Sequence, residues 1–135
     1  MEEQKEKELI FYEDDFKNNL LEGKGIYYCN NEPFKGDRYE GDWKNNNSEG
    51  KGIYYYHDGR RYEGDHKNNK IEGKGIMYYN DGARYEGDWK NGNREGKGIM
   101  YYNNGDREMG DYYNNKAIGK HVKLTNAGEV QINNY

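Results

Sequence analysis

The sequence predicts an all-β protein, an elongated single-layer twisted antiparallel sheet made of tandem β-hairpins. Two observations predict this fold. A unit repeats every 23 residues, because the run Tyr-Glu-Gly-Asp begins at Tyr39, Tyr62 and Tyr85. Asn-Gly and Asp-Gly steps also separate aromatic runs, which is a strong hairpin signal since these residues tolerate positive φ. A strict repeat of this length is typical of stacked supersecondary units.

The composition fits a thin β-structure with a small core spread along its length. The chain has 135 residues, of which 32% are hydrophobic, and half of that class is aromatic, with 16 Tyr, 3 Phe and 2 Trp. Low hydrophobicity with high charge is typical of disordered chains. The strict period and the many tyrosines, which favour strands and bury large rings, argue against disorder here.

Charge and cysteine content exclude several classes of protein. A net charge of −4 argues against nucleic-acid binding, which needs a basic face. The only cysteine, Cys29, cannot form an internal disulfide. No segment approaches the ~18 apolar residues of a membrane span, and the charged start lacks the apolar stretch of a secretory signal. We therefore expect a reducing, cytoplasmic location.

We expect a charged N-terminal tail at residues 1–10 and one repeat domain at residues 11–135. The first and last units depart from the pattern, as expected of terminal repeats that cover an exposed face. Residues 30–36 hold a four-residue insertion and the only proline, Pro33, and should form a bulged turn. The units are expected to start near Tyr12, Tyr39, Tyr62, Tyr85 and Glu108.

Each unit should contain two strands. In one regular unit we expect strands at residues 84–89 and 96–102, with turns at 91–93 and 103–105. A helix is not expected, because glycine recurs inside every segment and no 3.6-residue apolar pattern survives.

Side-chain parity predicts how the two strands pair. If Trp89 lies opposite Gly96, then Gly87 lies opposite Gly98 on the same face. Facing glycines leave a dent that a neighbouring aromatic ring can fill. The same register predicts exposed ion pairs within the hairpins on the other face, namely Asp42 with Lys51, Asp65 with Lys74, and Asp88 with Lys97.

The face opposite the glycines carries an apolar column. We expect this column to need cover from a terminal segment or from another chain. Its members are Ile53, Ile76, Ile99, Tyr55, Tyr78 and Tyr101.

The regular unit resembles the MORN repeat, the membrane occupation and recognition nexus. The resemblance rests on Tyr-Glu-Gly-Asp-Trp-Lys-Asn-Gly, then Gly-Lys-Gly, then Tyr-Tyr-Asn-Asp-Gly, and covers about residues 11–130. It implies a string of hairpins in one twisted sheet with an aromatic-lined groove. It also implies a non-enzymatic chain, because catalysis in this family comes from a separate attached domain. Cytoskeletal and ciliary scaffolds are the best-attested setting for small proteins of pure repeats.

The aromatic stripe is the candidate site. Its rings either pack only on one another and on glycine, or form a half-exposed groove that binds a helix or extended peptide of a partner protein. Phe16 belongs to the same stripe. The candidate groove residues are Tyr39, Trp43, Tyr56, Tyr62, His66, Tyr79, Tyr85, Trp89 and Tyr102.

Lysines and histidines offer weaker sites. A lysine column could contact acidic lipid head groups, although a facing aspartate column largely cancels its charge. The three histidines fall in different phases of the repeat, so no metal site and no cofactor are expected. His66 should act as a substitute ring in the stack and could titrate near neutral pH. The lysine column consists of Lys24, Lys51, Lys74, Lys97 and Lys120.

The sequence therefore predicts a non-enzymatic scaffold or interaction module, cytoskeletal or ciliary by resemblance, that binds a partner protein in its aromatic groove. The alternative is a membrane-contacting module that binds phosphoinositides or acidic phospholipid. The end strands, near Phe11 and at residues 130–132, should offer open edges for a homodimer or a partner strand.

Overall fold

The computed structural model describes residues 8–10, 16–17, 20–29 and 32–135, and the side chains from Leu21 onward within these ranges. Every regular element in this part of the chain is a strand, so the predicted all-β class is confirmed. The predicted unit start near Tyr12 and the end-strand residue Phe11 lie outside the described residues. Of the predicted tail, only residues 8–10 are described, and they pair as the first strand of the sheet.

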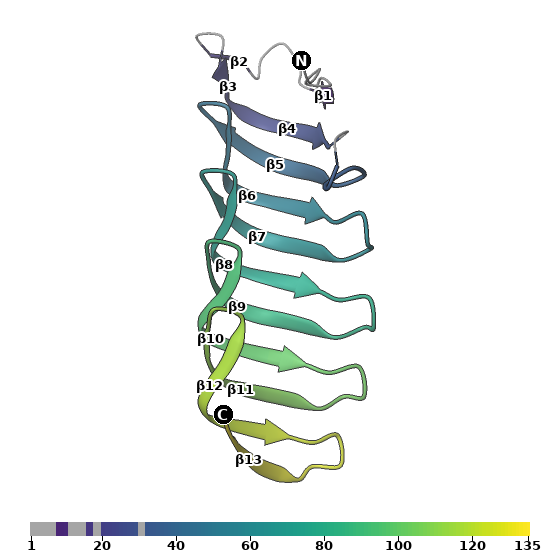
Figure 1. The fold of residues 1–135 in the computed structure, drawn as a ribbon, viewed down its shortest axis with the longest axis vertical. Coiled ribbons are helices and arrows are strands. Elements are labelled where there is room, and N and C mark those ends of the chain that lie inside the picture. The colour runs from purple at the N-terminus through teal and green to yellow at the C-terminus, as the bar shows by residue number, and fades with distance from the viewer. Residues whose placement is uncertain (1–7, 11–15, 18–19, 30–31) are drawn as a thin grey trace.

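Within the described residues, one open antiparallel sheet of 11 strands forms the body of the structure, and consecutive hairpins follow one another along its long axis (Figure 1). A separate two-stranded sheet pairs β2 (Phe16–Lys17) with β3 (Leu20–Leu21). The long sheet contains, in spatial order, β1 (Glu8–Ile10), β4 (Gly23–Tyr28), β5 (Arg38–Lys44), β6 (Asn47–Tyr55), β7 (Arg61–Lys67), β8 (Lys70–Tyr78), β9 (Arg84–Lys90), β10 (Asn93–Tyr101), β11 (Arg107–Tyr113), β12 (Lys116–Leu124) and β13 (Val130–Asn134).

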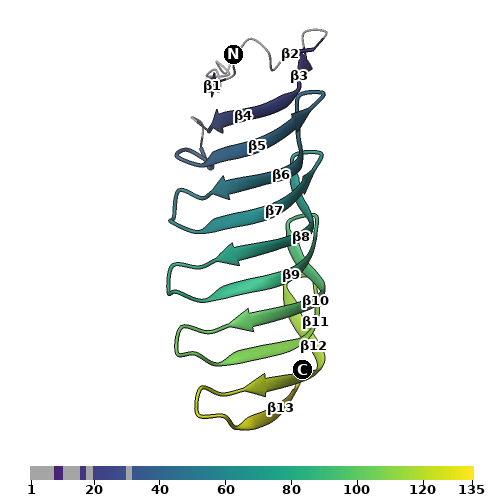
Figure 2. The same ribbon diagram turned by 180° about the vertical axis from the view of Figure 1, so that it is seen from behind.

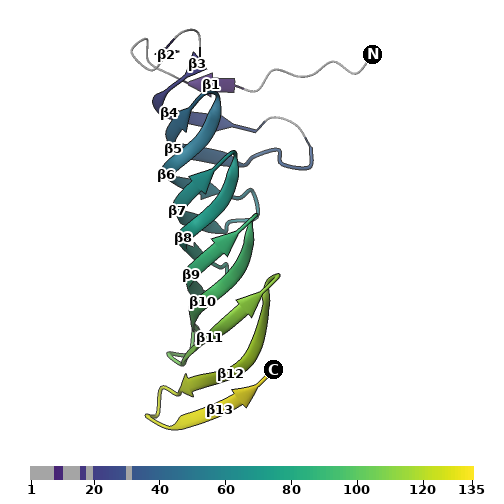
Figure 3. The ribbon, with the colours of Figure 1, turned by 90° about the vertical axis from the view of Figure 1, so that its left-hand side faces the viewer.

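Tight turns join the two strands of each hairpin, and Figure 2 shows the longer connections between hairpins at the opposite ends of the strands. The turn residues have positive φ, which Asn and Gly adopt at little cost. Figure 3 shows that the strands are curved rather than flat. The four tight turns are Asn45-Asn46, Asn68-Asn69, Asn91-Gly92 and Asn114-Asn115.

The pairing of Gly87 with Gly98 is confirmed, but the predicted pairing of Trp89 with Gly96 is wrong. Within its hairpin, Trp89 lies opposite Arg94, and the register then shifts before Gly98. The extra residues form a bulge in which Gly96 has φ of 72°. Side-chain parity alone could not reveal this shift, because a bulge breaks the simple count of residues.

The predicted ion pairs within each hairpin are wrong for the same reason. Each aspartate pairs with a lysine of the preceding unit, and in Asp42 and Asp65 the other oxygen accepts the N–H of the lysine in the same hairpin. These two aspartates therefore tie a bulge to the neighbouring unit. The ion pairs are Lys24–Asp42 at 2.7 Å, Lys51–Asp65, and Lys74–Asp88 at 3.0 Å. The backbone bonds run from Lys51 N to Asp42 at 3.1 Å and from Lys74 N to Asp65 at 3.0 Å.

Tyrosine rings fill the dents between facing glycines, as predicted. Tyr85 is fully buried, and a Cβ added to Gly98 would overlap its ring. The Tyr85 hydroxyl donates to the carbonyl of Asp88 at 3.3 Å, and Tyr62 makes the equivalent bond to Asp65 at 3.0 Å. The ring, the two glycines and this hydrogen bond form the repeated core of the unit.

The last unit builds the same core with its residue types exchanged. Glu108 stands at the tyrosine position and His121 at the second glycine position. The His121 ring covers Gly110, and its Nε2 donates to the carbonyl of Asp111 at 2.9 Å, as tyrosine does elsewhere. Both Glu108 and His121 are buried. The ring therefore comes from the second strand of the hairpin instead of the first.

Glu108 also binds the C-terminal segment. Its carboxylate accepts hydrogen bonds from Tyr135 at 2.7 Å, from Asn133 at 3.3 Å and from Tyr102 at 3.1 Å. Burial raises the pKa of the Glu108 carboxyl, but these hydrogen bonds outweigh burial and hold the pKa below its usual range. The charged carboxylate thus fixes β13 against the preceding strands.

Arginines cover the tyrosines of the opposite face. Arg61 lies over the ring of Tyr78 at 4.3 Å and also pairs with Glu63 at 3.2 Å. The arrangement recurs for Arg38 over Tyr55 at 4.1 Å and Arg84 over Tyr101 at 3.8 Å. The sequence predicts that a terminal segment or another chain covers this face. For these tyrosine rings, the arginine that opens each unit supplies the cover instead.

Candidate functional site

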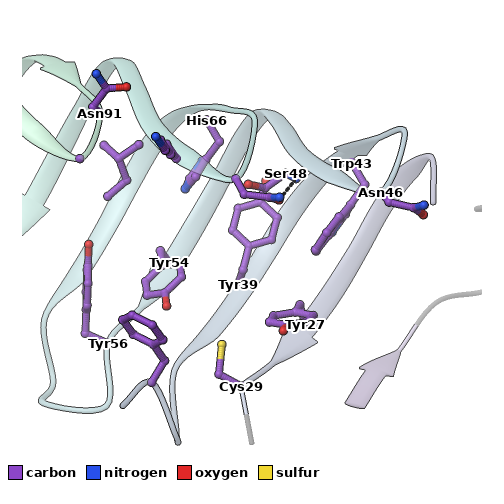
Figure 4. A pocket seen from close by; sticks show the side chains of 15 residues that line it. Tyr27, Cys29, Tyr39, Trp43, Asn46, Ser48, Tyr54, Tyr56, His66 and Asn91 are labelled. Atoms are coloured by element: carbon purple, nitrogen blue, oxygen red, sulfur yellow. Dashed lines mark hydrogen bonds between the residues drawn. The ribbon is translucent and has the colours of Figure 1, made fainter. Parts of the chain in front are cut away.

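A groove of about 650 Å³ lies on the aromatic face, between the rings of the sheet and the tight turns. Figure 4 shows the rings of Tyr27, Tyr39, Tyr54 and Tyr56 along the sheet, with Asn46 and Asn91 at the turns. The turns contribute to the groove wall because the strands curve toward that face. The groove is open and mainly aromatic, which suits an elongated apolar ligand.

A continuous zigzag of edge-to-face rings runs along the sheet, and Tyr39, Trp43 and His66 of this zigzag line the groove. Each inner ring contacts one ring in its own unit and one in an adjoining unit, at the separations favoured for aromatic pairs. The centroid distances are 5.3 Å for Tyr39–Trp43, 4.7 Å for Tyr39–His66, 5.2 Å for Tyr62–His66, 5.4 Å for Tyr62–Trp89, 5.2 Å for Tyr85–Trp89 and 5.0 Å for Tyr85–Tyr112.

His66 interrupts the tryptophan column in the middle of this zigzag. Trp43 and Trp89 each donate an indole N–H to a carbonyl of the preceding unit, at 3.2 and 3.1 Å. His66 is shorter, lies 3.2 Å from the carbonyl of Gly64 through Nδ1, and its Nε2 has no hydrogen-bond partner among the described residues. His66 lines the groove at the position where the neighbouring units carry Trp43 and Trp89, and its ring is smaller than an indole.

His66 does not titrate near neutral pH, contrary to the prediction. The side chain is 5% exposed, and burial lowers its pKa to about 4. The ring is therefore neutral at physiological pH, and it adds an apolar surface rather than a charge to the groove.

Hydrogen bonds between units hold the turns over the groove. Asn46 and Asn69 each accept, through Oδ1, a backbone N–H of the preceding unit at 2.8 Å. Asn115 makes the same bond to the N–H of Arg94 at 2.8 Å. The asparagines therefore serve two purposes, because their positive φ makes the turn and their amides stack the turns along the molecule.

A buried carboxylate anchors one end of the groove. Asp37 accepts the hydroxyl of Tyr54 at 2.5 Å and the backbone N–H of His57 at 2.7 Å, and it lies 2.6 Å from Nδ1 of His57. These contacts orient Tyr54, which lines the groove. The cluster was missed from the sequence because Asp37 follows the irregular insertion, and the next two units carry Arg60 and Ala83 at the equivalent position.

A second recess of about 270 Å³ adjoins the groove and is polar. It shares Tyr56 and Gly92 with the groove, so the two form a continuous surface. Its two cations are Arg60, which lies over Tyr56 at 4.3 Å, and Arg94, which lies over Tyr112 at 5.2 Å. No sequence signal singled out these arginines, because they stand at positions that vary from unit to unit.

The structure divides the predicted groove residues into three sets. Tyr39, Trp43, Tyr56 and His66 line the groove, and Tyr79 and Trp89 line the adjoining recess together with Tyr56. Tyr62, Tyr85 and Tyr102 line neither; the first two are fully buried in the core. The groove residues that the sequence did not single out include Tyr27, Tyr54, Asn46, Asn69 and Asn91.

The lysine column lies on the opposite face. Lys24, Lys51 and Lys74 are exposed, but each pairs with an aspartate. Lys24 holds the pKa of Asp42 below its usual range, so this carboxylate stays charged at neutral pH. Lys97 lies opposite Asp111 in the sheet, and Lys120 opposite the neutral Asn134. The ion pairs of the first three lysines reduce the net positive charge that this face offers to a lipid surface.

Among the described residues, no group of three or more His, Cys, Asp or Glu side chains is placed to hold a metal ion. In the part of the chain that the structure describes, no helix has the length and apolarity needed to cross a bilayer. The geometry favours binding through aromatic surface, turn amides and two guanidinium groups.

Comparison with known proteins bears on the repeat itself. A family model described as MORN repeat matches residues 15–32, 39–60, 62–84 and 85–107, together more than half of the chain. Residues 108–135 lie outside the matched segments, in keeping with the exchanged residues of the last unit. A search of curated proteins returns no match.

Proposed function

The chain belongs to the MORN repeat family, and on that premise we propose that it is a non-enzymatic scaffold that binds a helix or extended peptide of a partner protein in its aromatic groove. Repeats of this family indicate an interaction module for proteins or membranes, and the family is generally non-enzymatic. A cytoplasmic, cytoskeletal or ciliary assembly is the setting that we propose.

The observation that carries this proposal is the groove at the His66 step. His66 stands where the neighbouring units carry tryptophan, and it lines the groove together with Trp43, Tyr54 and Tyr56. Partly exposed rings beside a recess are typical anchors for a partner side chain. The proposal thus depends on one position where the repeat departs from its own pattern.

A protein segment fits this surface better than an acidic membrane does. The groove is recessed between the sheet and the turns, and it is mainly aromatic. The lysines expected to contact lipid lie on the other face, and three of the five are paired with aspartates. A flat membrane surface on that face would meet a lysine column whose charge is largely balanced, and it would not reach the groove.

The test is to fill the groove by His66→Trp, which copies the side chain of Trp43 and Trp89. Ile76→Trp adds the same side chain to the opposite face and is the matched control. Peptides selected from a random displayed library on the wild-type protein should bind His66→Trp at least about tenfold more weakly and Ile76→Trp with unchanged Kd. Equal binding to His66→Trp would place the peptide elsewhere and contradict the proposal.

Alanine substitution of Trp43 and Trp89 would be a poorer test. Both side chains are buried in the ring stack, so truncation is expected to lower the free energy of unfolding by several kcal/mol, typically ~3–5 for a buried tryptophan. Loss of binding would then not distinguish a missing contact from a lost fold. His66→Trp avoids this difficulty because it restores the side chain that the neighbouring units already accommodate.

A further inference from the structure

We propose that the segment bound in the groove is acidic, and that one of its carboxylates binds between Arg60 and Arg94. This inference rests on the proposed function and adds the chemistry of the partner. Both arginines line the recess that continues the groove past Tyr56, together with Tyr79, Trp89 and Asn115. A peptide lying in the groove would therefore present its next side chains to this recess.

The two guanidinium groups are held in place by contacts that leave hydrogen-bond donors available. Arg60 lies over Tyr56 and uses its Nε to bind Asp58 at 2.8 Å. Arg94 lies between the rings of Tyr85 and Tyr112 and donates through Nη2 to the carbonyl of Asn115. Among the described residues, the remaining guanidinium nitrogens of both have no hydrogen-bond partner. Stacked, pre-oriented guanidinium groups suit planar carboxylates.

The distribution of charge over the two faces supports an anionic partner. The charged residues that line the groove and the recess are Lys70, Arg60 and Arg94, and no carboxylate lines either. Six acidic residues of the regular units lie on the opposite face, where arginines and lysines of the same face pair with them. These six are Glu40, Asp42, Glu63, Asp65, Glu86 and Asp88. The lining of the groove and the recess thus carries three cations and no carboxylate, although Asp58 pairs with Arg60 beside the recess and the chain carries a net charge of −4.

A peptide carboxylate explains the site better than a lipid head group. The recess is contiguous with an aromatic groove, so a chain can place an apolar side chain near His66 and a carboxylate beside Arg60 at the same time. A head group would use the recess alone and leave the groove empty. The expected motif is therefore an aromatic or large apolar residue followed within a few positions by Asp or Glu.

The test compares library selection on the wild-type protein and on Arg60→Gln/Arg94→Gln. Arg61→Gln/Arg84→Gln removes the same charge from the opposite face and is the matched control. Peptides selected on the wild type should carry Asp or Glu near an aromatic residue, and replacing the acid by its amide should weaken binding about tenfold or more. The recess variant should bind the acid and amide peptides equally, whereas the control should still prefer the acid.

The comparison of acid and amide peptides is made on the wild-type protein. It therefore remains a valid test even if Arg60→Gln/Arg94→Gln disturbs the fold through loss of the Arg94 ring contacts. Selected peptides without an acidic preference would overturn this inference and leave the groove proposal standing. Absence of any selected peptide would instead contradict the groove proposal itself. Binding to vesicles that contain acidic phospholipid supplies the remaining comparison. If the vesicles bind in a way that depends on Arg60 and Arg94, and the selection yields no acidic peptides, the recess would be assigned to lipid and the inference overturned.

Discussion

His66 shows how one residue alters the chemistry of a repeated surface. It keeps the ring contacts of the tryptophans, at 4.7 Å to Tyr39 and 5.2 Å to Tyr62, but lacks the reach and the indole hydrogen bond. The smaller ring lines the groove, and burial keeps it uncharged. A single substitution in an otherwise regular column therefore changes the surface that the groove presents.

The lowered pKa of His66 predicts that the free energy of unfolding decreases as the pH falls. The unfolded chain binds a proton below about pH 6.5, whereas the folded protein does not protonate His66 until the pH approaches its pKa of about 4. Stability is therefore lost as the pH falls through this window, by about 2–3 kcal/mol between pH 7 and pH 4.5.

Urea unfolding at both pH values would measure this loss. His66→Trp removes the titrating group, while the carboxylates that titrate in the same range are common to both proteins. The variant should therefore lose less stability on acidification by about 2–3 kcal/mol. An identical pH dependence in the two proteins would show that burial of His66 is not coupled to folding.

At Glu108 and His121 the last unit exchanges which of two contacting positions carries the core ring. We expect His121→Gly to lower the free energy of unfolding by about 2–4 kcal/mol, because it removes the buried ring over Gly110. Glu108→Tyr alone should also destabilise, because its new ring would compete with His121 for the same space. The double variant recreates the tyrosine and glycine of the regular unit.

A double-mutant cycle measured by urea unfolding would test this exchange. The two changes should be coupled by more than about 1 kcal/mol, with the double variant more stable than the sum of the single changes predicts. The double variant still loses the Glu108 contacts to Tyr102 and Tyr135, so it need not reach wild-type stability. Additive effects would mean that His121 does not replace the tyrosine ring.

At the scale of elements, the stacked turns hold consecutive hairpins in register. Asn69 accepts the N–H of Ser48, and Asn115 accepts that of Arg94, both at 2.8 Å. In the unit between them Gly92 stands at the equivalent position, so the side-chain acceptor for Ile71 is missing. The groove wall is therefore less firmly tied at this turn than at its neighbours.

Gly92→Asn should restore the missing bond. Gly92 has φ of 79°, which asparagine tolerates, and nothing lies within 4 Å of an added Cβ. We expect the free energy of unfolding to rise by about 0.5–1.5 kcal/mol, and Asn69→Gly to lower it by a similar amount. Thermal and urea unfolding would check both variants. A Gly92→Asn protein that is no more stable than wild type would contradict the proposed role of the turn amides.

For the whole molecule, the open edge at β13 predicts self-association. An apolar row crosses the last strands, where Met109 pairs with Val122 and Val122 pairs with Ile132. Met109 and Ile132 are each 49% exposed, and β13 carries no lysine, proline or bulge of the kind that protects edge strands. Antiparallel pairing of two β13 strands would join the two apolar rows.

Sedimentation over a range of protein concentrations would measure this association. Ile132→Lys should shift the protein toward monomer, because the charge lies on the edge strand itself. Ile118→Lys is the matched control, since Ile118 is 44% exposed but lies on β12 rather than on the edge. A protein that stays monomeric throughout, or that responds equally to both changes, would contradict pairing through β13.

The repeat allowed most of the fold to be predicted, and the glycine dents could be placed as well. Gly87 and Gly98 face each other, and Tyr85 fills the space above them. The ion pairs were misplaced by one unit, because the bulge at Gly96 shifts the register by an amount that no side-chain pattern records. The roles of Arg60, Arg94 and Asp37 were missed because each occupies a position where the units differ.

The sequence by itself determined the all-β class, the hairpin order and the two faces of the sheet, because strand alternation and positive-φ turns are local properties that repeat with the chain. Only the tertiary structure decided which rings are buried and where the groove opens. Those features depend on how adjacent units pack, on how the curved strands bring the turns over the sheet, and on how the small ring of His66 packs between Tyr39 and Tyr62.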